Sequence, residues 1–326
     1  MSIARSVRGP LDAASAGRLV KRIASRWLLL ADYGAAARRN MTIAWACIFG
    51  LVVTNIIWLA STSMVFAASN RASLLSLGLW MTLLGTCFGL ALRRLRTEND
   101  RTARLLTSVL ERADLAWRGF LPTIALLTAL VTYSYLATAA ALPLRDGVLA
   151  AIDVSLGFHW PSFLRLVNAS PPFFKVLTTA YDSIEPVGIG MIIWLALFRR
   201  GDRLAEFVAV LSVAVIALAV LMLMVPAAGA FAFYQPAPDL YANLAPAGEM
   251  WTFSREFTML RDGSLSVIDL SATTGVVSFP SFHTILAVVT VYPLRDTRWL
   301  MGTVAAIIVA LRSRTGIMSH AVLRSA

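Results

Sequence analysis

The chain has 326 residues, of which 58% are hydrophobic and only 14% are charged. A soluble domain of this composition would expose far more apolar surface than it could bury, so the composition excludes an ordinary soluble protein and predicts a membrane protein. The net charge of +11 does not indicate a nucleic-acid partner, because the arginines flank apolar runs and do not form one patch.

The first forty residues carry eight scattered basic side chains and precede an apolar run that is too long for the core of a signal peptide. We therefore expect residues 1–40 to stay attached as a cytoplasmic basic segment. Between residues 19 and 35 the apolar side chains recur at helical spacing. This pattern is compatible with an amphipathic helix on an anionic membrane surface or with a solvated basic arm.

Apolar runs of spanning length predict an all-α, polytopic membrane helix bundle with six or seven transmembrane helices. Two of the runs are less regular. Residues 173–198 reach spanning length only by including Asp182 and Glu185, and residues 299–311 are short unless the helix continues into the arginine-bearing tail. The five clear runs are residues 41–68, 72–92, 119–142, 207–230 and 276–294.

Basic residues alternate between the connections, which predicts the orientation of the chain. Seven lie in the second connection and three in the fourth, whereas the first, third and fifth connections carry one, two and two. Because short cytoplasmic connections are rich in Lys and Arg, we expect a cytoplasmic amino terminus and an external fifth connection. The predicted location is a bacterial plasma (inner) membrane, with several passes.

Two external segments are more than simple linkers. Residues 148–167 form a mostly apolar strip interrupted by Asp153 and His159, which predicts a helix in the outer membrane interface. Residues 234–251 are rich in Pro, Ala, Tyr and Asn, which predicts an irregular loop over the outer mouth of the bundle.

In this topology all three histidines of the chain, His159, His283 and His320, lie at the outer membrane face. His283 ends the run S-F-P-S-F-H at the start of a span, where free backbone N–H groups can bind an anion. His320 completes the spacing S-R-x5-H with Ser313 and Arg314. Two histidines and an arginine around an anion site are suited to phosphoryl transfer through a covalent phosphohistidine.

These motifs resemble those of the phosphatidic acid phosphatase type 2 superfamily of membrane phosphatases and phosphotransferases, whose second motif is P-S-G-H and whose third is S-R-x5-H-x3-D. The bulky residue in P-S-F-H resembles the branch that includes inositol phosphorylceramide synthase. The stretches that also resemble this branch are R-D-G at 261–263, I-D-L at 268–270, D-V-S-L-G-F-H-W at 153–160 and A-Y-D-S at 180–183.

The resemblance covers roughly residues 143–326 and implies a phosphatase-like or phosphotransferase-like membrane domain there, with an outward-facing site. Residues 41–142 would be amino-terminal transmembrane helices outside the resemblance. The implied substrate is a lipid phosphate or a phospholipid, and membrane lipids are the other expected partners. Neither a cofactor nor a metal is expected, because no cluster of carboxylates has metal-ligand spacing.

The resemblance also implies roles for individual residues. His320 would attack phosphorus, and His283 would protonate the departing oxygen. The phosphate-binding residues would be Arg314, Ser281 and Arg261, where Arg261 substitutes for the cation of the first family motif, K-x6-R-P, which this chain lacks. Asp182 and Glu185 are further candidates for a supporting role, because ionisable groups within a span are costly and often mark a site.

The tail departs from the family pattern. Arg324 stands where the family has an aspartate, and the chain stops two residues later. We therefore expect an atypical or truncated carboxyl terminus that would impair the activity. Three functions stay open: a metal-independent lipid phosphatase or head-group phosphotransferase, a non-catalytic membrane protein derived from the family, and a lipid or solute transporter.

Overall fold

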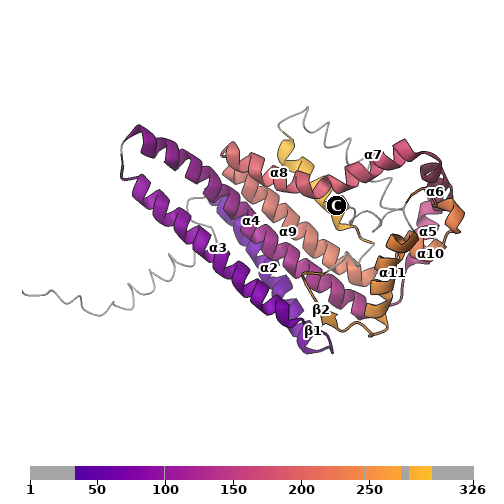
Figure 1. Cartoon of the computed structure of the whole chain (residues 1–326). Coiled ribbons are helices and arrows are strands. Elements are labelled where there is room, and N and C mark those ends of the chain that lie inside the picture. Colours follow the sequence, from indigo (N-terminus) through magenta and orange to yellow (C-terminus); the bar gives the residue numbers. More distant parts are fainter. Residues whose placement is uncertain (1–33, 99, 245–246, 273–278, 296–326) are drawn as a thin grey trace, which may run out of the picture.

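The computed structural model describes residues 34–98, 100–244, 247–272 and 279–295, and in these ranges the chain is mostly helical (Figure 1). Four helices are long and apolar enough to cross a membrane, or up to six if each of two bent helix pairs is one span. The predicted all-α, multi-pass membrane bundle is thereby confirmed. The basic segment up to residue 33 and the predicted span at 299–311 lie outside the described residues.

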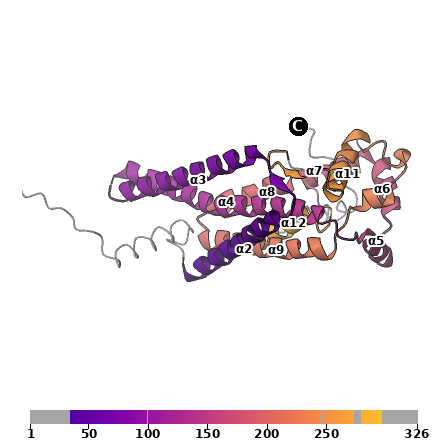
Figure 2. The ribbon, with the colours of Figure 1, turned by 90° about the horizontal axis from the view of Figure 1, so that it is seen from below.

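Three of the long helices form the centre of the bundle. Helices α2 (Ala35–Ala60) and α4 (Arg101–Ala139) pack against each other and against α9 (Gly201–Met224). Helix α3 (Ala68–Leu95) packs along α4 at the edge of the bundle, and most of its surface faces away from the protein (Figures 1 and 2). The amino-terminal helices are thus part of the same core as α9.

The predicted interface helix over residues 148–167 is two helices, α5 (Asp146–Ser155) and α6 (Trp160–Ala169), bent by 78°. Gly157 between them has φ +78°, a left-handed conformation that ends a helix easily only at glycine. Pro161 then lies in the first turn of α6, where a missing N–H costs nothing. The prediction of one continuous helix was wrong because it ignored this Gly and Pro pair.

The predicted span at 173–198 is likewise broken into α7 (Pro171–Asp182) and α8 (Ile184–Leu197), bent by 41°. The cause lies in the sequence. Pro186 has no N–H to donate to the carbonyl of Asp182, and its ring crowds that carbonyl. The break therefore falls beside Ser183.

The fifth connection contains more regular structure than the sequence predicts. It holds α10 (Ala230–Tyr234), the 3-10 turn η1 (Pro238–Leu240) and α11 (Ala247–Arg261), so the irregular loop predicted over 234–251 ends at residue 247. These elements lie with α5 and α6 at one end of the bundle (Figure 1). Strand β2 (Val267–Ile268) follows and pairs in parallel with β1 (Val65–Phe66) of the first connection.

A buried asparagine fastens this connection to the amino-terminal helices. Asn70, near the start of α3, donates from Nδ2 to the Ile268 carbonyl at 2.6 Å and accepts at Oδ1 from the Leu270 N–H at 2.9 Å. Both polar atoms of the side chain thus bond to backbone groups at the end of β2 and just after it. Together with the β1–β2 pairing, this side chain holds residues almost 200 positions apart in sequence.

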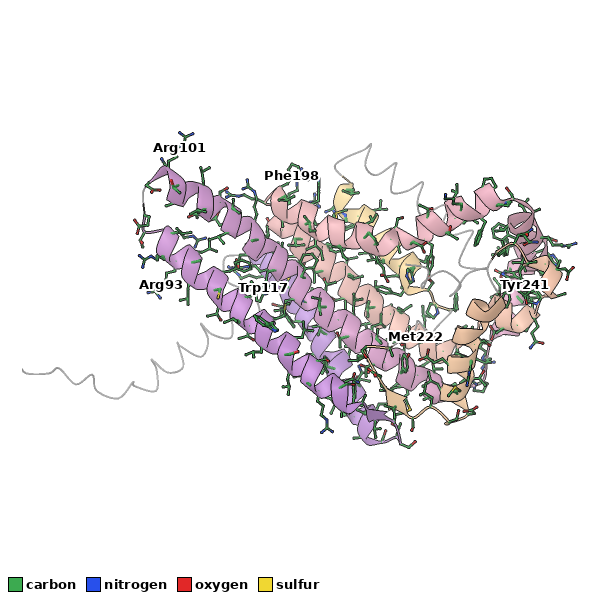
Figure 3. All side chains as sticks on the ribbon, viewed as in Figure 1. Arg93, Arg101, Trp117, Phe198, Met222 and Tyr241 are labelled. Atoms are coloured by element: carbon green, nitrogen blue, oxygen red, sulfur yellow. The ribbon has the colours of Figure 1, made fainter. Side chains whose placement is uncertain are left out.

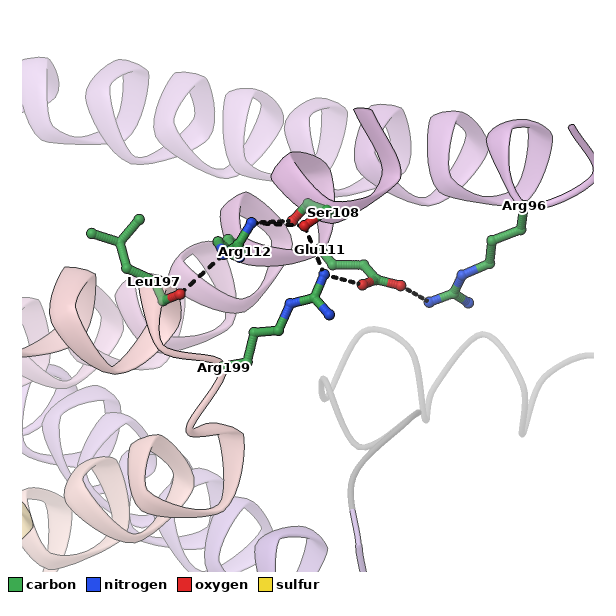
Figure 4. A network of polar contacts seen from close by, with 6 residues as sticks. All are labelled: Arg96, Ser108, Glu111, Arg112, Leu197 and Arg199. Carbon is green, nitrogen blue, oxygen red and sulfur yellow. Dashed lines mark hydrogen bonds and ion pairs between the residues drawn. The ribbon is translucent and has the colours of Figure 1, made fainter. Parts of the chain in front are cut away.

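The opposite end of the bundle carries the arginine-rich connections. Figure 3 labels Arg93 and Arg101 there and Tyr241 at the far end. The Glu111 carboxylate lies 3.2 Å from Arg96 and 2.9 Å from Arg199, so it joins the second connection to the fourth (Figure 4). All three side chains are a third or more exposed, so each pair stabilises the fold by only about 0–1 kcal/mol.

The last described helix, α12 (Phe282–Val291), packs against α8 and α9 and continues into the 3-10 turn η2 (Tyr292–Leu294). It is shorter than the span predicted at 276–294, and residues 276–278 of that span lie outside the described residues. The Arg295 guanidinium at its end lies 2.9 Å from the Glu206 carboxylate of α9. This contact holds the carboxyl end of the α12–η2 segment against α9.

Candidate functional site

The start of α12 carries the histidine on which the predicted chemistry depends. The hydroxyl of Ser281 accepts a long hydrogen bond, 3.4 Å, from the Thr284 N–H, so Ser281 is the N-cap of the helix. His283 follows in the first turn, where backbone N–H groups lack helical partners and the helix dipole is positive. Ser281 uses an acceptor position for the cap, and its O–H remains a donor that can reach a ligand oxygen.

Both ring nitrogens of His283 face polar side chains. Nδ1 lies 3.1 Å from the Tyr181 hydroxyl, and Nε2 lies 3.5 Å from a carboxylate oxygen of Glu185. The Tyr181 and His283 rings also stack, with centroids 4.3 Å apart and planes 24° apart. One aromatic residue and one acid thus fix the position and the charge environment of the imidazole.

The two partners differ in their access to solvent or lipid. Tyr181 is buried, with 6% of its surface exposed, whereas the Glu185 side chain is 57% exposed. The His283 side chain lies between these values, at 17%. The Nδ1 side of the imidazole therefore faces the protein interior, and the Nε2 side faces the open side of the site.

Tyr181 and Glu185 lie four residues apart on either side of the 41° break between α7 and α8, and both contact His283. On α8 the face of Glu185 continues at Gly188, where an added Cβ would lie 3.3 Å from Leu286 Cδ1. Gly188 lies one turn beyond Glu185 on α8, and Leu286 lies one turn beyond His283 on α12, so the two contacts are neighbours. The absence of a side chain at Gly188 lets α12 approach α8 at the site.

Arg261 has contacts of a different kind. Its guanidinium donates to the Leu142 carbonyl at 2.9 Å and lies over the Phe257 ring. Burial lowers the pKa of Arg261, and the charge of Asp146 opposes that shift. Among the described residues Arg261 makes no hydrogen bond or ion pair with Ser281 or His283.

A short chain of backbone contacts nevertheless connects this arginine region to the histidine motif. The Asp146 carboxylate accepts from the N–H groups of Ala228 and Gly229 at 3.0 and 2.9 Å. The preceding residue, Ala227, forms an antiparallel bridge with Phe279, two residues before Ser281. Asp146 therefore holds residues 227–229 in place, and this segment pairs with Phe279, the residue just before the P-S-F-H motif.

The other predicted site residues are placed as follows. Asp182 is exposed at the end of α7, and His159 caps α6 locally, with Nδ1 2.8 Å from the Ser162 hydroxyl. Arg314 and His320 lie outside the described residues. Within the described ranges no group of three or more His, Cys, Asp or Glu side chains could hold a metal ion.

Sequence reasoning gave Tyr181 no role, although it noted the A-Y-D-S stretch in which Tyr181 lies. The available signal was the spacing to Glu185, which places an aromatic ring and an acid on the same face. A spacing within one helix cannot say which distant residue that face meets. The contact with His283 spans 102 positions and depends on how α12 packs.

The model of the PAP2 superfamily matches residues 147–319, a little over half of the 326-residue chain. The matched range contains Tyr181, Glu185, His283 and Arg314, and it ends one residue before His320. No curated protein and no solved structure matches the chain.

Proposed function

Because the chain belongs to the PAP2 superfamily, we propose that it is a membrane lipid phosphatase or phospholipid head-group phosphotransferase that acts through a phosphohistidine. The observation that carries the proposal is the setting of His283. A largely buried imidazole at a helix start, in contact with Tyr181 and Glu185, supports a general-acid role beside a region that attracts anions.

In the proposed first step, a ring nitrogen of His320 attacks phosphorus and forms an N–P bond while the P–O bond to the lipid alcohol breaks. The departing oxygen takes a proton from His283 and leaves as the alcohol. The Arg314 guanidinium and the Ser281 O–H would stabilise the phosphoryl oxygens, because charge-assisted donors bind them best. Arg261 would contribute through the frame of the site, in keeping with its contacts to Leu142 and Asp146.

In the second step, water or an acceptor alcohol attacks the phosphohistidine and gives up its proton to His283. Water yields inorganic phosphate, and an alcohol yields a new phosphate ester. In both cases His320 is released, and His283 is again protonated. The cycle needs no cofactor or metal, because histidine supplies both the nucleophile and the acid.

The finer features of the proposal rest on the sequence. The P-S-F-H and A-Y-D-S stretches support the branch that resembles inositol phosphorylceramide synthase. The alternation of basic residues supports a site on the periplasmic face of a bacterial inner membrane and a cytoplasmic amino terminus. We propose lipid phosphates or phospholipids as substrates, presented from the surrounding membrane, and residues 143–326 as the catalytic membrane domain behind the helices at 41–142.

One observation favours a second candidate, a non-catalytic member of the family. Arg324 occupies the place of the family aspartate that would orient the nucleophile. A carboxylate in that role holds a histidine in the right tautomer and stabilises its charged form, and a guanidinium does neither. The same test separates the two candidates.

The test compares His283→Ala and His320→Ala in purified full-length protein with two substrates, a lipid phosphate and an aryl phosphate with a good leaving group. Loss of the general acid should reduce turnover of the lipid phosphate by roughly 10²- to 10⁴-fold, with a much smaller effect on the aryl phosphate. His320→Ala should abolish both activities. His159→Ala, at the third histidine, is the matched control and should leave both unchanged.

Full activity of His320→Ala in a folded protein would rule out the phosphohistidine route. No activity in the unmodified chain towards either substrate would favour the non-catalytic reading. In that case Arg324→Asp is the informative variant, because restored activity would identify the tail as the cause.

A further inference from the structure

We propose that Tyr181 is the positioning residue of His283: its hydroxyl oxygen accepts from Nδ1–H, which leaves Nε2, the nitrogen that faces the open side of the site, to give up the proton and to take it back. This inference rests on the proposed function, since it assigns a partner to the proposed general acid. It adds a residue for which the sequence offered no role.

The chemistry of the two groups determines the direction of the hydrogen bond. The imidazolium that acts as the acid carries a proton on each ring nitrogen, and it loses the proton that faces the departing oxygen, at Nε2. The ring proton that remains is on Nδ1, so Nδ1–H donates to the Tyr181 hydroxyl oxygen, 3.1 Å away.

The same hydrogen bond serves both charge states of the ring. Nδ1 keeps its proton in the imidazolium and in the neutral ring that follows proton transfer, so Nδ1–H donates to the phenol oxygen in both. Tyr181 can thus contact Nδ1 both before and after His283 gives up its proton. Stacking at a centroid distance of 4.3 Å limits rotation of the imidazole during this exchange.

Glu185 marks the position from which the proton leaves. Its oxygen is 3.5 Å from Nε2, longer than a good N–H donor contact of about 2.9 Å, so an incoming oxygen can compete for the same proton. The burial of Tyr181 and the exposure of Glu185 therefore give the ring one closed side and one reactive side.

The decisive variant is Tyr181→Phe, which keeps the stacked ring and removes only the hydroxyl. Tyr133→Phe is the matched control, because Tyr133 is equally buried and its hydroxyl donates to the Ala219 carbonyl at 3.0 Å, away from any histidine. Each variant is measured on the lipid phosphate and on the aryl phosphate, together with its melting temperature in detergent.

Tyr181→Phe should lower kcat on the lipid phosphate by roughly 5- to 20-fold, the range expected for one lost hydrogen bond to a functional group. The aryl phosphate should be affected much less, because its departure needs little protonation. KM should change little on either substrate. Tyr133→Phe should affect both substrates equally or not at all.

A double-mutant cycle gives a second readout. In the His283→Ala background, Tyr181→Phe should cause no further loss, since its effect passes through the imidazole. An equal loss on both substrates, or additive losses in the cycle, would overturn the positioning role and leave Tyr181 as a packing residue. If His283→Ala itself lacks the leaving-group dependence, the proposed acid is wrong, and the inference falls with it.

Should the phenylalanine variant fail to fold, fluorotyrosine at position 181 keeps the shape of the ring and its hydroxyl. Its more acidic phenol is a weaker acceptor from Nδ1–H. The ratio of lipid phosphate to aryl phosphate turnover should then change. An unchanged ratio contradicts the proposal.

Discussion

Replacing Gly188 by leucine is expected to move α8 and α12 apart at the site, and so to separate Glu185 from His283. A Cβ at position 188 would already lie 3.3 and 3.5 Å from the two terminal carbons of Leu286, so a leucine side chain fits only if the Leu286 side chain or α12 moves. Overpacking of this kind costs about 1–3 kcal/mol in a close-packed core. The Glu185–His283 contact is 3.5 Å, and a shift of about 1 Å would carry it beyond the ion-pair range of about 4 Å.

We therefore expect Gly188→Leu to lower the melting temperature in detergent and to reduce turnover of the lipid phosphate at least tenfold, as the acid loses its alignment. Gly188→Ala should be almost neutral, because the gain in helix propensity of about 1 kcal/mol offsets the tight Cβ contact. Gly190→Leu is the control on the same helix, since nothing lies within 4 Å of a Cβ there. Unchanged stability and activity in Gly188→Leu, or equal damage in Gly190→Leu, would refute this account of how the helices approach.

Two further predictions concern the rest of the bundle. Asn70→Ala should destabilise the fold by about 1–3 kcal/mol and increase proteolysis after Arg261, because it removes two buried hydrogen bonds, to the Ile268 carbonyl and from the Leu270 N–H. Asn243→Ala, which removes only the exposed side-chain hydrogen bond to the Asn168 carbonyl, should do much less. In a chain without Cys47 and Cys87, a cysteine at position 243 should react with an impermeant thiol reagent on intact cells and one at position 101 should not, and the reverse pattern would invert the predicted orientation.

The long spans were predictable because the membrane imposes a simple rule on them. A helix that crosses lipid must satisfy its backbone internally and present about 20 apolar residues, and this leaves a direct mark on composition. Helices α2, α3, α4 and α9 carry that mark. The predicted bounds agree to within four residues for α3 and at the carboxyl end of α4, whereas α2 and α9 lie six to eight residues nearer the amino terminus than predicted. Helix α4 begins at Arg101, well before the predicted start at residue 119, because its charged first turns extend beyond the apolar run.

The broken segments were harder to predict, since hydropathy averages over the residues that matter. The signals were single positions: Gly157 and Pro161 between α5 and α6, and Pro186 just after the α7–α8 junction. Each acts on one or two backbone groups and barely changes the mean hydropathy of a run. A reading that weighs proline and glycine before hydropathy would have found both breaks.

The site was predictable only in part. The sequence singled out His283 from its motif and Glu185 from the cost of an acid within a span, but it could not show that they meet. Arg261 illustrates the opposite case, because its proposed phosphate role came from a motif position, whereas its described contacts go to the Leu142 carbonyl, the Phe257 ring and the charge of Asp146. Such pairings are decided by tertiary packing.

The two broken helix pairs also bear on the choice between catalysis and transport. Transporters built from internal repeats place broken helices in corresponding positions of two halves, with the breaks meeting at a shared substrate site. Here the pairs α5–α6 and α7–α8 are consecutive, and both lie in the stretch from Asp146 to Leu197. In the described part of the chain the acid at the second break contacts a histidine of α12, not the first break. A break with an acid and a phenol beside one imidazole fits the proposed proton transfer at a fixed point. Within the described ranges it has no counterpart in a second half of the protein.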